Sequence, residues 1–215
     1  MAKLVIDIVS DTVCPWCYVG KRRLERALAS VPASAEVRWH PFFLDLTLPE
    51  AGTDKLAHYN KKFGAARVSQ MLPMMEKVGA ADGIKFDYGG KIAATEASHA
   101  LLSAALSHGG AALQDLMVES FFRFYFEERG NLGDVPALVA LATSAGLPAV
   151  AVEAALAPPS RAAVRAEERQ WRTAHAVSGV PHFVIARADG SGSPVELSGA
   201  QDPAAFVAAF RELLG

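Results

Sequence analysis

The sequence predicts an α/β fold that is interrupted by a large helical segment, and two observations support this prediction. Short apolar runs rich in β-branched residues occur only toward the two ends of the chain, and such runs are typical of buried strands. They lie at residues 3–9, 36–43, 180–186 and 194–197. Residues 45–159 instead carry helical patterns with no clear strand.

The order of the elements indicates one core with an insertion. A helical pattern follows the first apolar run, so the first two strands are expected to pair in parallel with a right-handed crossover. Helices are expected at residues 55–63, 69–78, 93–107, 111–129, 135–145, 146–156, 161–177 and 203–214. The predicted order is therefore βαβ, a helical block, and αββα. We expect one domain made of residues 1–44 and 160–215, with residues 45–159 inserted as a helical domain.

Composition and charge narrow the classes of function. The 215 residues, 51% of them hydrophobic, suffice for a full core. A formal net charge of −2 gives no electrostatic reason to expect nucleic acid or an anionic membrane as a partner. The chain shows no signal-peptide pattern and no apolar run long enough for a membrane helix. We therefore expect a cytoplasmic protein, monomeric or homodimeric, in a compartment that keeps thiols reduced.

The candidate reactive motif is Cys14-Pro15-Trp16-Cys17, which holds the only two cysteines of the chain. The motif lies between the first strand and the first helix, so Cys14 is expected at the helix N-cap and Pro15 in the first helical position. The unpaired backbone N–H groups and the helix dipole there favour the thiolate of Cys14. Cys17 lies one turn deeper, within disulfide distance. We predict that Cys14, open to solvent, attacks a disulfide and that Cys17 resolves the product.

Three other roles for the two cysteines are weaker. Two buried apolar cysteines would fit a core helix, but Pro15 and the polar approach through Ser10 and Asp11 argue against that position. A zinc site needs about four ligands, and this motif supplies two of them. A structural disulfide would close too short a loop to constrain the unfolded chain. Redox chemistry without a metal is the favoured interpretation.

Five segments carry a resemblance to a known family. They are Asp11-x-x-Cys14-Pro15-Trp16-Cys17-Tyr18-x-Gly20-Lys21-Arg22, Thr95-Glu96-Ala97-Ser98-His99-Ala100, Phe121-Phe122 through Tyr125-Phe126 to Gly133-Asp134, Ser178-Gly179-Val180-Pro181-x-Phe183, and Ser198-Gly199-Ala200-Gln201. Together they resemble the FrnE-like branch of the DsbA family, which is related to 2-hydroxychromene-2-carboxylate isomerases and kappa-class glutathione transferases. The resemblance covers nearly the whole chain. It implies a thioredoxin-like fold with a large all-helical insertion, thiol–disulfide exchange, and no bound metal or organic cofactor.

The resemblance also indicates a substrate-binding loop. Val180-Pro181 matches the loop that in this fold carries a cis-proline beside the disulfide, which leaves the Val180 backbone free to pair with an extended substrate. A trans-proline that starts an edge strand is the alternative. The isomerases and kappa-class transferases replace the leading cysteine with serine and use glutathione, whereas this chain keeps both cysteines. The further cysteines that some FrnE-like proteins carry in a C-terminal extension do not occur here.

The roles of the neighbouring residues stay open between chemistry and structure. Trp16, expected to be exposed, either offers substrate an apolar platform or packs on the insertion. Lys21 could support a thiolate, but a solvated surface lysine is the better interpretation. Asp11 either relays protons near the thiols or caps the helix. His99 is better explained as a core histidine with its polar atoms paired than as a catalytic one. With Pro15, these residues are candidates for tuning the thiols.

The favoured function is a thiol–disulfide oxidoreductase that exchanges disulfides of proteins or peptides, with glutathione as a further candidate partner. A reducing compartment would favour reductase or isomerase work. One alternative is a glutathione-dependent isomerase or transferase acting on a small aromatic molecule. Another is a holdase-type binding protein whose insertion holds unfolded chains by its apolar surface.

Overall fold

A computed structural model describes residues 3–215 of the chain. Its strands are β1 (Lys3–Ser10), β2 (Ser34–Pro41), β3 (Thr53–Asp54), β4 (Lys91–Ile92), β5 (His182–Arg187) and β6 (Val195–Ser198). Its helices are α1 (Pro15–Ala29), α2 (Lys55–Phe63), α3 (Ala65–Ala81), α4 (Glu96–Phe126), α5 (Val135–Ser144), α6 (Ala149–Leu156), α7 (Pro158–Ala174) and α8 (Pro203–Leu214). The expected strands and helices are all present. The short strands β3 and β4 were not expected from the sequence.

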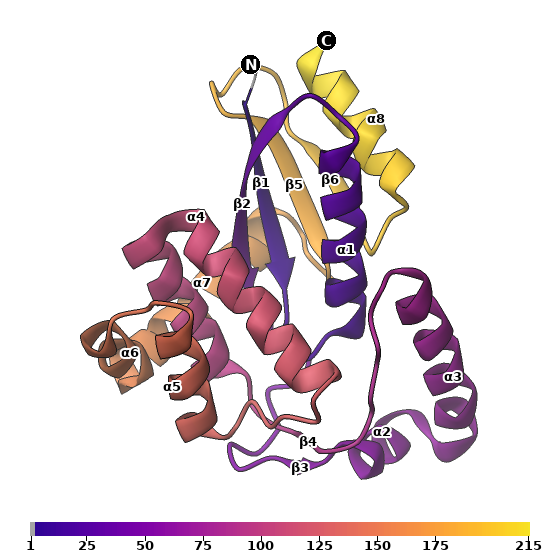
Figure 1. Cartoon of the computed structure of the whole chain (residues 1–215), viewed down its shortest axis with the longest axis vertical. Coiled ribbons are helices and arrows are strands. Elements are labelled where there is room, and N and C mark those ends of the chain that lie inside the picture. The colour runs from indigo at the N-terminus through magenta and orange to yellow at the C-terminus, as the bar shows by residue number, and fades with distance from the viewer. Residues whose placement is uncertain (1–2) are drawn as a thin grey trace.

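A four-stranded mixed sheet forms the centre of the fold, with its strands in the order β2-β1-β5-β6 (Figure 1). β1 pairs in parallel with β2, as the sequence predicts, and antiparallel with β5. Leu4, Ile6 and Ile8 of β1 share one face of the sheet and are fully buried there. Since β1 is internal, its carboxyl end brings the loop of residues 11–14 to the middle of the sheet.

The helices divide between the two sides of this sheet. α1 packs against α8 on one side, while α4 and α7 pack against β2 on the other (Figure 1). α2 and α3 lie beyond the carboxyl end of β1, and α5 and α6 lie next to α4 (Figure 1). This arrangement confirms the α/β fold with a helical insertion, while the exact limits of the insertion, 45 and 159, stay a prediction. Over residues 3–215, no helix combines the length and the apolarity that crossing a bilayer requires.

The longest helix, α4, bends at Gly110. The φ of 68° and ψ of −169° at this residue lie outside the helical region and suit a glycine, which carries no Cβ. The bend explains why the sequence predicts two helices, at residues 93–107 and 111–129, where the structure has one bent element. The second half of α4 then passes β2 and reaches the start of α1.

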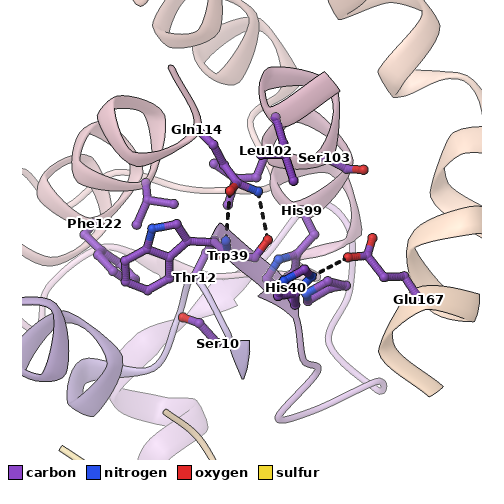
Figure 2. Close-up of a pocket in the computed structure, with 13 residues that line it drawn as sticks. Ser10, Thr12, Trp39, His40, His99, Leu102, Ser103, Gln114, Phe122 and Glu167 are labelled. Carbon is purple, nitrogen blue, oxygen red and sulfur yellow. Dashed lines mark hydrogen bonds and ion pairs between the residues drawn. The ribbon is translucent and has the colours of Figure 1, made fainter. Parts of the chain in front are cut away.

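A single side chain of α4 closes the edge of β2. Gln114 accepts a hydrogen bond from the Trp39 backbone N–H at 2.8 Å and donates one to the Trp39 carbonyl at 2.8 Å (Figure 2). An edge strand leaves such backbone groups without a strand partner. Because Gln114 is fully buried, it both fixes α4 on the sheet and satisfies the backbone there.

His40 joins β2 to α7 through a buried ion pair. Its Nδ1 lies 2.9 Å from Glu167 Oε1 (Figure 2), and its Nε2 lies 2.8 Å from Asp7 Oδ1. Its ring also lies against Trp171, with 3.9 Å between the ring centroids. Burial alone would lower the pKa of His40, but the two carboxylates outweigh burial and raise it. The folded state therefore favours the protonated imidazole.

His40→Gln is expected to destabilise the protein most at acidic pH. A raised pKa in the folded state means that the contribution of His40 is fully present below its ordinary value near 6.5 and fades as the pH rises through the folded-state pKa. The unfolding free energy should fall by about 1–3 kcal/mol at pH 6 and by less at pH 9. Urea unfolding measures both. Glu167→Gln should reproduce part of the effect, and an equal loss at both pH values would contradict the prediction.

Candidate active site at the start of α1

Cys14 is the N-cap residue of α1, and Pro15 takes the first helical position, as the sequence predicts. The backbone of Cys14 is extended, with φ −90° and ψ 112°. Its N–H donates to the Asp11 carbonyl at 3.0 Å, and its carbonyl accepts from the Cys17 N–H at 3.0 Å. The Cys14 side chain makes no capping hydrogen bond. The partial positive charge of the first helical turn is therefore available to a thiolate at this position.

Both cysteines are reduced, and neither opens directly to solvent. Cys14 is 4% exposed and Cys17 is 0% exposed. The expectation of a solvent-open Cys14 is therefore wrong. The segment around Val180 and the helices α2 and α3 cover the start of α1, and Cys14 lines a cavity between them. This cavity is the opening toward the Cys14 side chain.

Cys17 lies on the inner side of α1. Burial raises the pKa of its thiol well above the ordinary range, and the neighbouring Cys14 raises it further. Hydrogen bonds from the Ser10 side chain and the Asp11 backbone act in the opposite direction without outweighing burial. The thiol of Cys17 is therefore protonated at neutral pH. The two sulfurs of one motif lie in different environments.

The loop of Val180 and Pro181 lies directly against Cys14. The peptide bond between these two residues is cis, and the Cys14 thiol donates to the Val180 carbonyl over 3.6 Å. Gly20 of α1 permits this close approach, since a Cβ at this position would lie 3.0 Å from Pro181 Cγ and 3.1 Å from Phe183 Cζ. The structure thus brings the expected substrate-binding loop next to the expected nucleophile.

The cavity beside Cys14 has a volume of about 710 Å³. The start of α1 and the Val180 loop form one wall, and α2 and α3 contribute much of the rest. Its apolar lining comprises Val13, Trp16, Leu44, Leu48, Tyr59, Phe63, Met71, Met74, Met75, Tyr88 and Ile92. Trp16 is 37% exposed, as expected. Such a volume suits a small molecule or a few side chains of a peptide, and methionines adapt to varied shapes.

Charged side chains give one part of the cavity a positive character. Lys62 pairs with Asp45 at 3.0 Å, while Arg67 lies over the ring of Phe63 at 5.9 Å. Hydrogen bonds from Thr47, assisted by Lys62, lower the pKa of Asp45 to about 2. Two cations therefore face one carboxylate at neutral pH, which favours a substrate with an anionic group. Among residues 3–215, no group of three or more His, Cys, Asp or Glu side chains could hold a metal ion.

Asp11 does not cap α1. Its Oδ2 accepts from the Leu44 N–H at 2.8 Å and its Oδ1 from the Val13 N–H at 3.4 Å, so it joins the loop before α1 to the segment that enters the insertion. His99, in the first turn of α4, has its Nε2 3.5 Å from Asp11 Oδ1. His99 is buried, as expected. However, its Nε2 has no hydrogen-bond partner within the described range 3–215, so the expectation of a fully paired core histidine is wrong.

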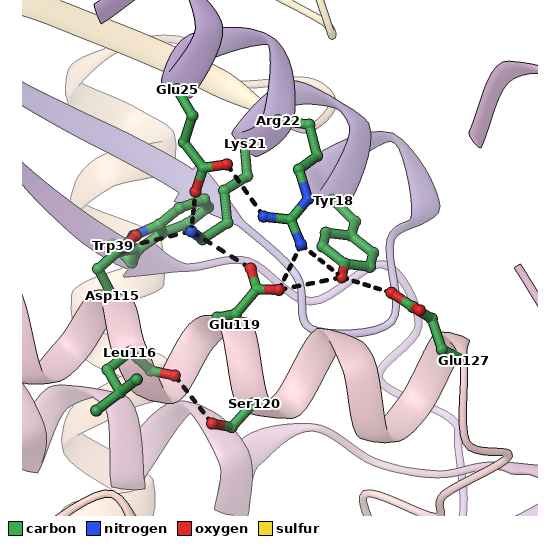
Figure 3. A network of polar contacts seen from close by, with 10 residues as sticks. All are labelled: Tyr18, Lys21, Arg22, Glu25, Trp39, Asp115, Leu116, Glu119, Ser120 and Glu127. Carbon is green, nitrogen blue, oxygen red and sulfur yellow. Dashed lines mark hydrogen bonds and ion pairs between the residues drawn. The ribbon is translucent and has the colours of Figure 1, made fainter. Parts of the chain in front are cut away.

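Lys21 is not the solvated surface lysine that the sequence favours. It is buried, and its Nζ pairs with Glu25, with Asp115 at 3.1 Å and with Glu119 at 3.5 Å (Figure 3). Burial alone would lower the pKa of Lys21, but these carboxylates outweigh burial and raise it. Its ammonium group therefore links α1 to α4.

Tyr18, directly after Cys17, belongs to the same network. Its hydroxyl donates to Glu127 at 2.7 Å and accepts from Arg22 at 3.0 Å (Figure 3). Its ring stacks on Phe122 with 5.0 Å between the centroids. Burial and the neighbouring carboxylates raise the pKa of Tyr18, so the hydroxyl stays protonated and can donate. α1 is thus fixed on α4 at the residue next to the second cysteine.

The sequence matches the family model of the DSBA-like thioredoxin domain over residues 5–211. The chain belongs to this DsbA-like family. The cysteine motif at the start of α1 and the Val180 loop therefore lie in a fold built for thiol chemistry in other members of the family.

Individual relatives agree with the assignment to the DsbA-like family. A solved structure described as a probable DsbA oxidoreductase, SCO1869 from Streptomyces coelicolor, is 31% identical with a TM-score of 0.82, over 97% of this chain and 89% of that chain. The cytosolic disulfide reductase DsbM from Pseudomonas aeruginosa is 21% identical with a TM-score of 0.67, over 97% of each chain. Its structure with GSH is 20% identical with a TM-score of 0.58, over 86% of this chain and 89% of that chain. The uncharacterized protein YwbO from Bacillus subtilis (strain 168) is 28% identical over 181 residues, 84% of this chain and 86% of that protein.

Sequence reasoning missed several residues of this DsbA-like site. Ser10 is one of them, and its sequence signal is a polar residue at the end of an apolar strand that leads into the motif. Tyr59, Lys62 and Arg67 line the cavity from α2 and α3. No signal in the sequence places these helices beside Cys14, because they belong to the insertion and are distant from Cys14 along the chain.

Gly20→Ala is expected to slow disulfide exchange at Cys14. The added Cβ would meet Pro181 and Phe183 at 3.0–3.1 Å, so the loop must move away from α1 and from the sulfur. The second-order rate of the Cys14 thiol with a small disulfide should fall several-fold. Ser30→Ala, at the C-terminal end of α1 and away from the loop, is the matched control. An unchanged rate would show that the contact with the loop has no part in the chemistry.

Lys55 fixes the start of α2 and thereby one wall of the cavity. It is fully buried, its Nζ donates to the Tyr125 carbonyl at 3.0 Å, and it lies 3.9 Å from the centroid of the Tyr125 ring. This places the ammonium at the C-terminal end of α4, where the helix dipole is negative. Burial lowers the pKa of Lys55 to about 8, and the carboxylate of Asp87 offsets only part of this effect.

The stability of the protein relative to Lys55→Met is expected to rise between pH 8 and 10.5. In this range the unfolded chain still binds the proton that the folded protein has released, so the unfolding free energy of the wild type increases with pH. The gain should reach about 3 kcal/mol at most. Urea unfolding of both proteins measures it. A constant difference across the range would show that the Tyr125 ring and carbonyl keep the ammonium charged.

Proposed function

We propose that this chain is a thiol–disulfide oxidoreductase in which Cys14 attacks a substrate disulfide and Cys17 resolves the intermediate. The position of Cys14 carries the proposal. It is the N-cap residue of α1, lies against the Val180 carbonyl, and lines a mainly apolar cavity. These features would stabilise a thiolate, offer a backbone acceptor to an extended substrate, and accommodate the groups next to the disulfide.

The exchange proceeds in two balanced steps. The Cys14 thiolate attacks one sulfur of the substrate disulfide, forms a mixed disulfide, and releases the other substrate sulfur as a thiolate. Cys17 then loses its proton and attacks the Cys14 sulfur. The Cys14–Cys17 disulfide forms, and the second substrate thiolate leaves. The protein is oxidised by two electrons and the substrate is reduced by two, and the reverse sequence oxidises a dithiol.

Disulfides of proteins or peptides are the proposed substrates, and glutathione is the proposed small partner. The Val180 carbonyl and the apolar cavity suit an extended chain, while Lys62 and Arg67 suit the carboxylates of a peptide such as glutathione. DsbM, which shares the fold, is described as a cytosolic disulfide reductase and is also solved with GSH. We propose work in the cytoplasm, where a reducing glutathione pool would favour the reductase or isomerase direction.

A second candidate function is a glutathione-dependent isomerisation or transfer on a small aromatic molecule. The observation that favours it is the size and the aromatic lining of the cavity, which Trp16, Tyr59 and Tyr88 share. This chemistry needs one nucleophilic group and no resolving thiol. A glutathione-saturable activity that persists in Cys17→Ala would favour this function over disulfide exchange.

Cys14→Ser is expected to abolish the reduction of insulin disulfides, because a hydroxyl does not replace the thiolate as nucleophile. Cys17→Ala should instead accumulate mixed disulfides between Cys14 and substrate. Turbidity of reduced insulin follows turnover, and intact mass detects the adducts. Ser30→Ala, at the far end of α1, is the control and should keep full turnover. Unchanged turnover in Cys14→Ser would rule out the proposed mechanism.

A further inference from the structure

A small cavity with a mixed polar and apolar lining lies beside the end of β1. Its volume is about 20 Å³, and its lining includes Ser10 and Thr12 around the end of β1 and His99 from α4 (Figure 2). The far wall carries His40 and Glu167. A cavity of this size has room for one water molecule when polar atoms surround it. It is separate from the large cavity that gives access to Cys14.

His99 lines this cavity and carries an unpaired nitrogen. The residue is 4% exposed, and its Nε2 has no hydrogen-bond partner among the residues described, 3–215. Its ring packs edge-on against Phe43, with 5.4 Å between the ring centroids. Leaving a buried polar atom unpaired is costly in free energy. Such an atom at the edge of a cavity points to a group that exchanges a proton or holds a water molecule there.

The resolving step creates a need for a proton acceptor on this side of α1. Cys17 is 0% exposed, and the step requires its thiolate. Burial raises the pKa of this thiol, so the proton does not leave readily on its own. Besides Cys14, the Ser10 side chain and the Asp11 backbone offer hydrogen bonds to the Cys17 sulfur. Ser10 also lines the small cavity that His99 lines.

We propose that His99 accepts the proton that Cys17 loses in the resolving step, through the Ser10 hydroxyl and one water molecule in the small cavity. The proposal rests on the proposed function. The proton moves from Cys17 to His99 Nε2, the bond between the Cys17 and Cys14 sulfurs forms, and the bond between Cys14 and the substrate sulfur breaks. The substrate leaves as a thiolate and takes up a proton from the imidazolium by way of solvent.

Asp11 stabilises the proton on His99. Its Oδ1 lies 3.5 Å from Nε2, so it stabilises the imidazolium once the proton has arrived. The other charged groups around His99 are already paired. His40 pairs with Asp7 and with Glu167 of α7 across the cavity, and Glu96, one turn before His99, pairs with Arg165. His99 is therefore the side chain on this wall that is free to accept a proton.

The test measures the resolving step of Cys17 separately from the attack by Cys14. Each protein, reduced and mixed with 5,5′-dithiobis(2-nitrobenzoate), releases one thionitrobenzoate when Cys14 attacks and a second when Cys17 resolves. The second release is recorded from pH 5.5 to 9.5 by stopped flow. His99→Gln should slow it about tenfold or more near pH 7. The deficit should shrink as the pH rises, because hydroxide then removes the Cys17 proton. His108→Gln, at an exposed histidine of the same helix, should show the wild-type profile.

The outcomes test the proposed function and the role of His99 separately. If the wild type forms no Cys14 adduct, the proposed function fails. If the adduct forms and resolves at equal rates in wild type and His99→Gln, only the role of His99 is overturned. A rate lowered by one factor at every pH is a structural effect and overturns it too. Should His99→Gln not fold, Asp11→Asn is the second variant. It should slow the second release several-fold near neutral pH, and an unchanged rate would overturn the proposal.

Discussion

The packing of α1 on the second half of α4 is the interaction on which the site depends. Tyr18 stacks on Phe122, and the cations of Lys21 and Arg22 reach the carboxylates of α4 (Figure 3). These contacts begin at the residue after Cys17 and continue into the next helical turn, so they set the position of the helix start. Ion pairs that are partly buried lose much of their Coulomb energy to desolvation. We therefore assign this network chiefly to the orientation of α1, and the burial of the aromatic rings to its stability.

Cys14 and Cys17 lie one helical turn apart, and their sulfurs have different environments. Cys14, at the N-cap, lines the large cavity and lies at the positive end of the helix. Cys17 points toward the end of β1, where burial opposes its ionisation. In the proposed exchange, the helix end would favour a thiolate at Cys14, whereas burial keeps the proton on Cys17 until the resolving step.

Elements that depend on local sequence patterns were predicted correctly, whereas contacts between distant segments of the chain were not. The strand, the cysteine motif and the first helix follow from patterns within about 30 residues, and their order is sufficient to predict the sheet. Lys21 shows the limit. It lies among charged residues of an amphipathic helix and was expected in solvent, but two of its three partners, Asp115 and Glu119, come from α4, almost a hundred residues later. The exposure of Cys14 was mispredicted for the same reason, since its cover comes from α2, α3 and Val180.

His99 illustrates a finer limit of sequence reasoning. Its burial follows from the Ala- and Leu-rich pattern of its helix, which the sequence shows. Whether its Nε2 finds a partner depends on a few tenths of an ångström at the contact with Asp11, where the separation is 3.5 Å. Composition and periodicity carry no information on that scale. The unpaired atom, which is the feature of chemical interest, is therefore visible only in the structure.

The second half of α4 positions both sides of the large cavity. On one side it holds α1 through Tyr18, and on the other the Tyr125 carbonyl holds Lys55 at the start of α2. Phe126, next to Tyr125, also contacts the ring of Tyr18 at 6.1 Å between the centroids. One helix end thus sets the distance between the cysteine motif and the cavity wall that covers it. Because Cys14 and this wall line the same cavity, the proposed function assigns the choice of substrate to the insertion and the chemistry to the start of α1.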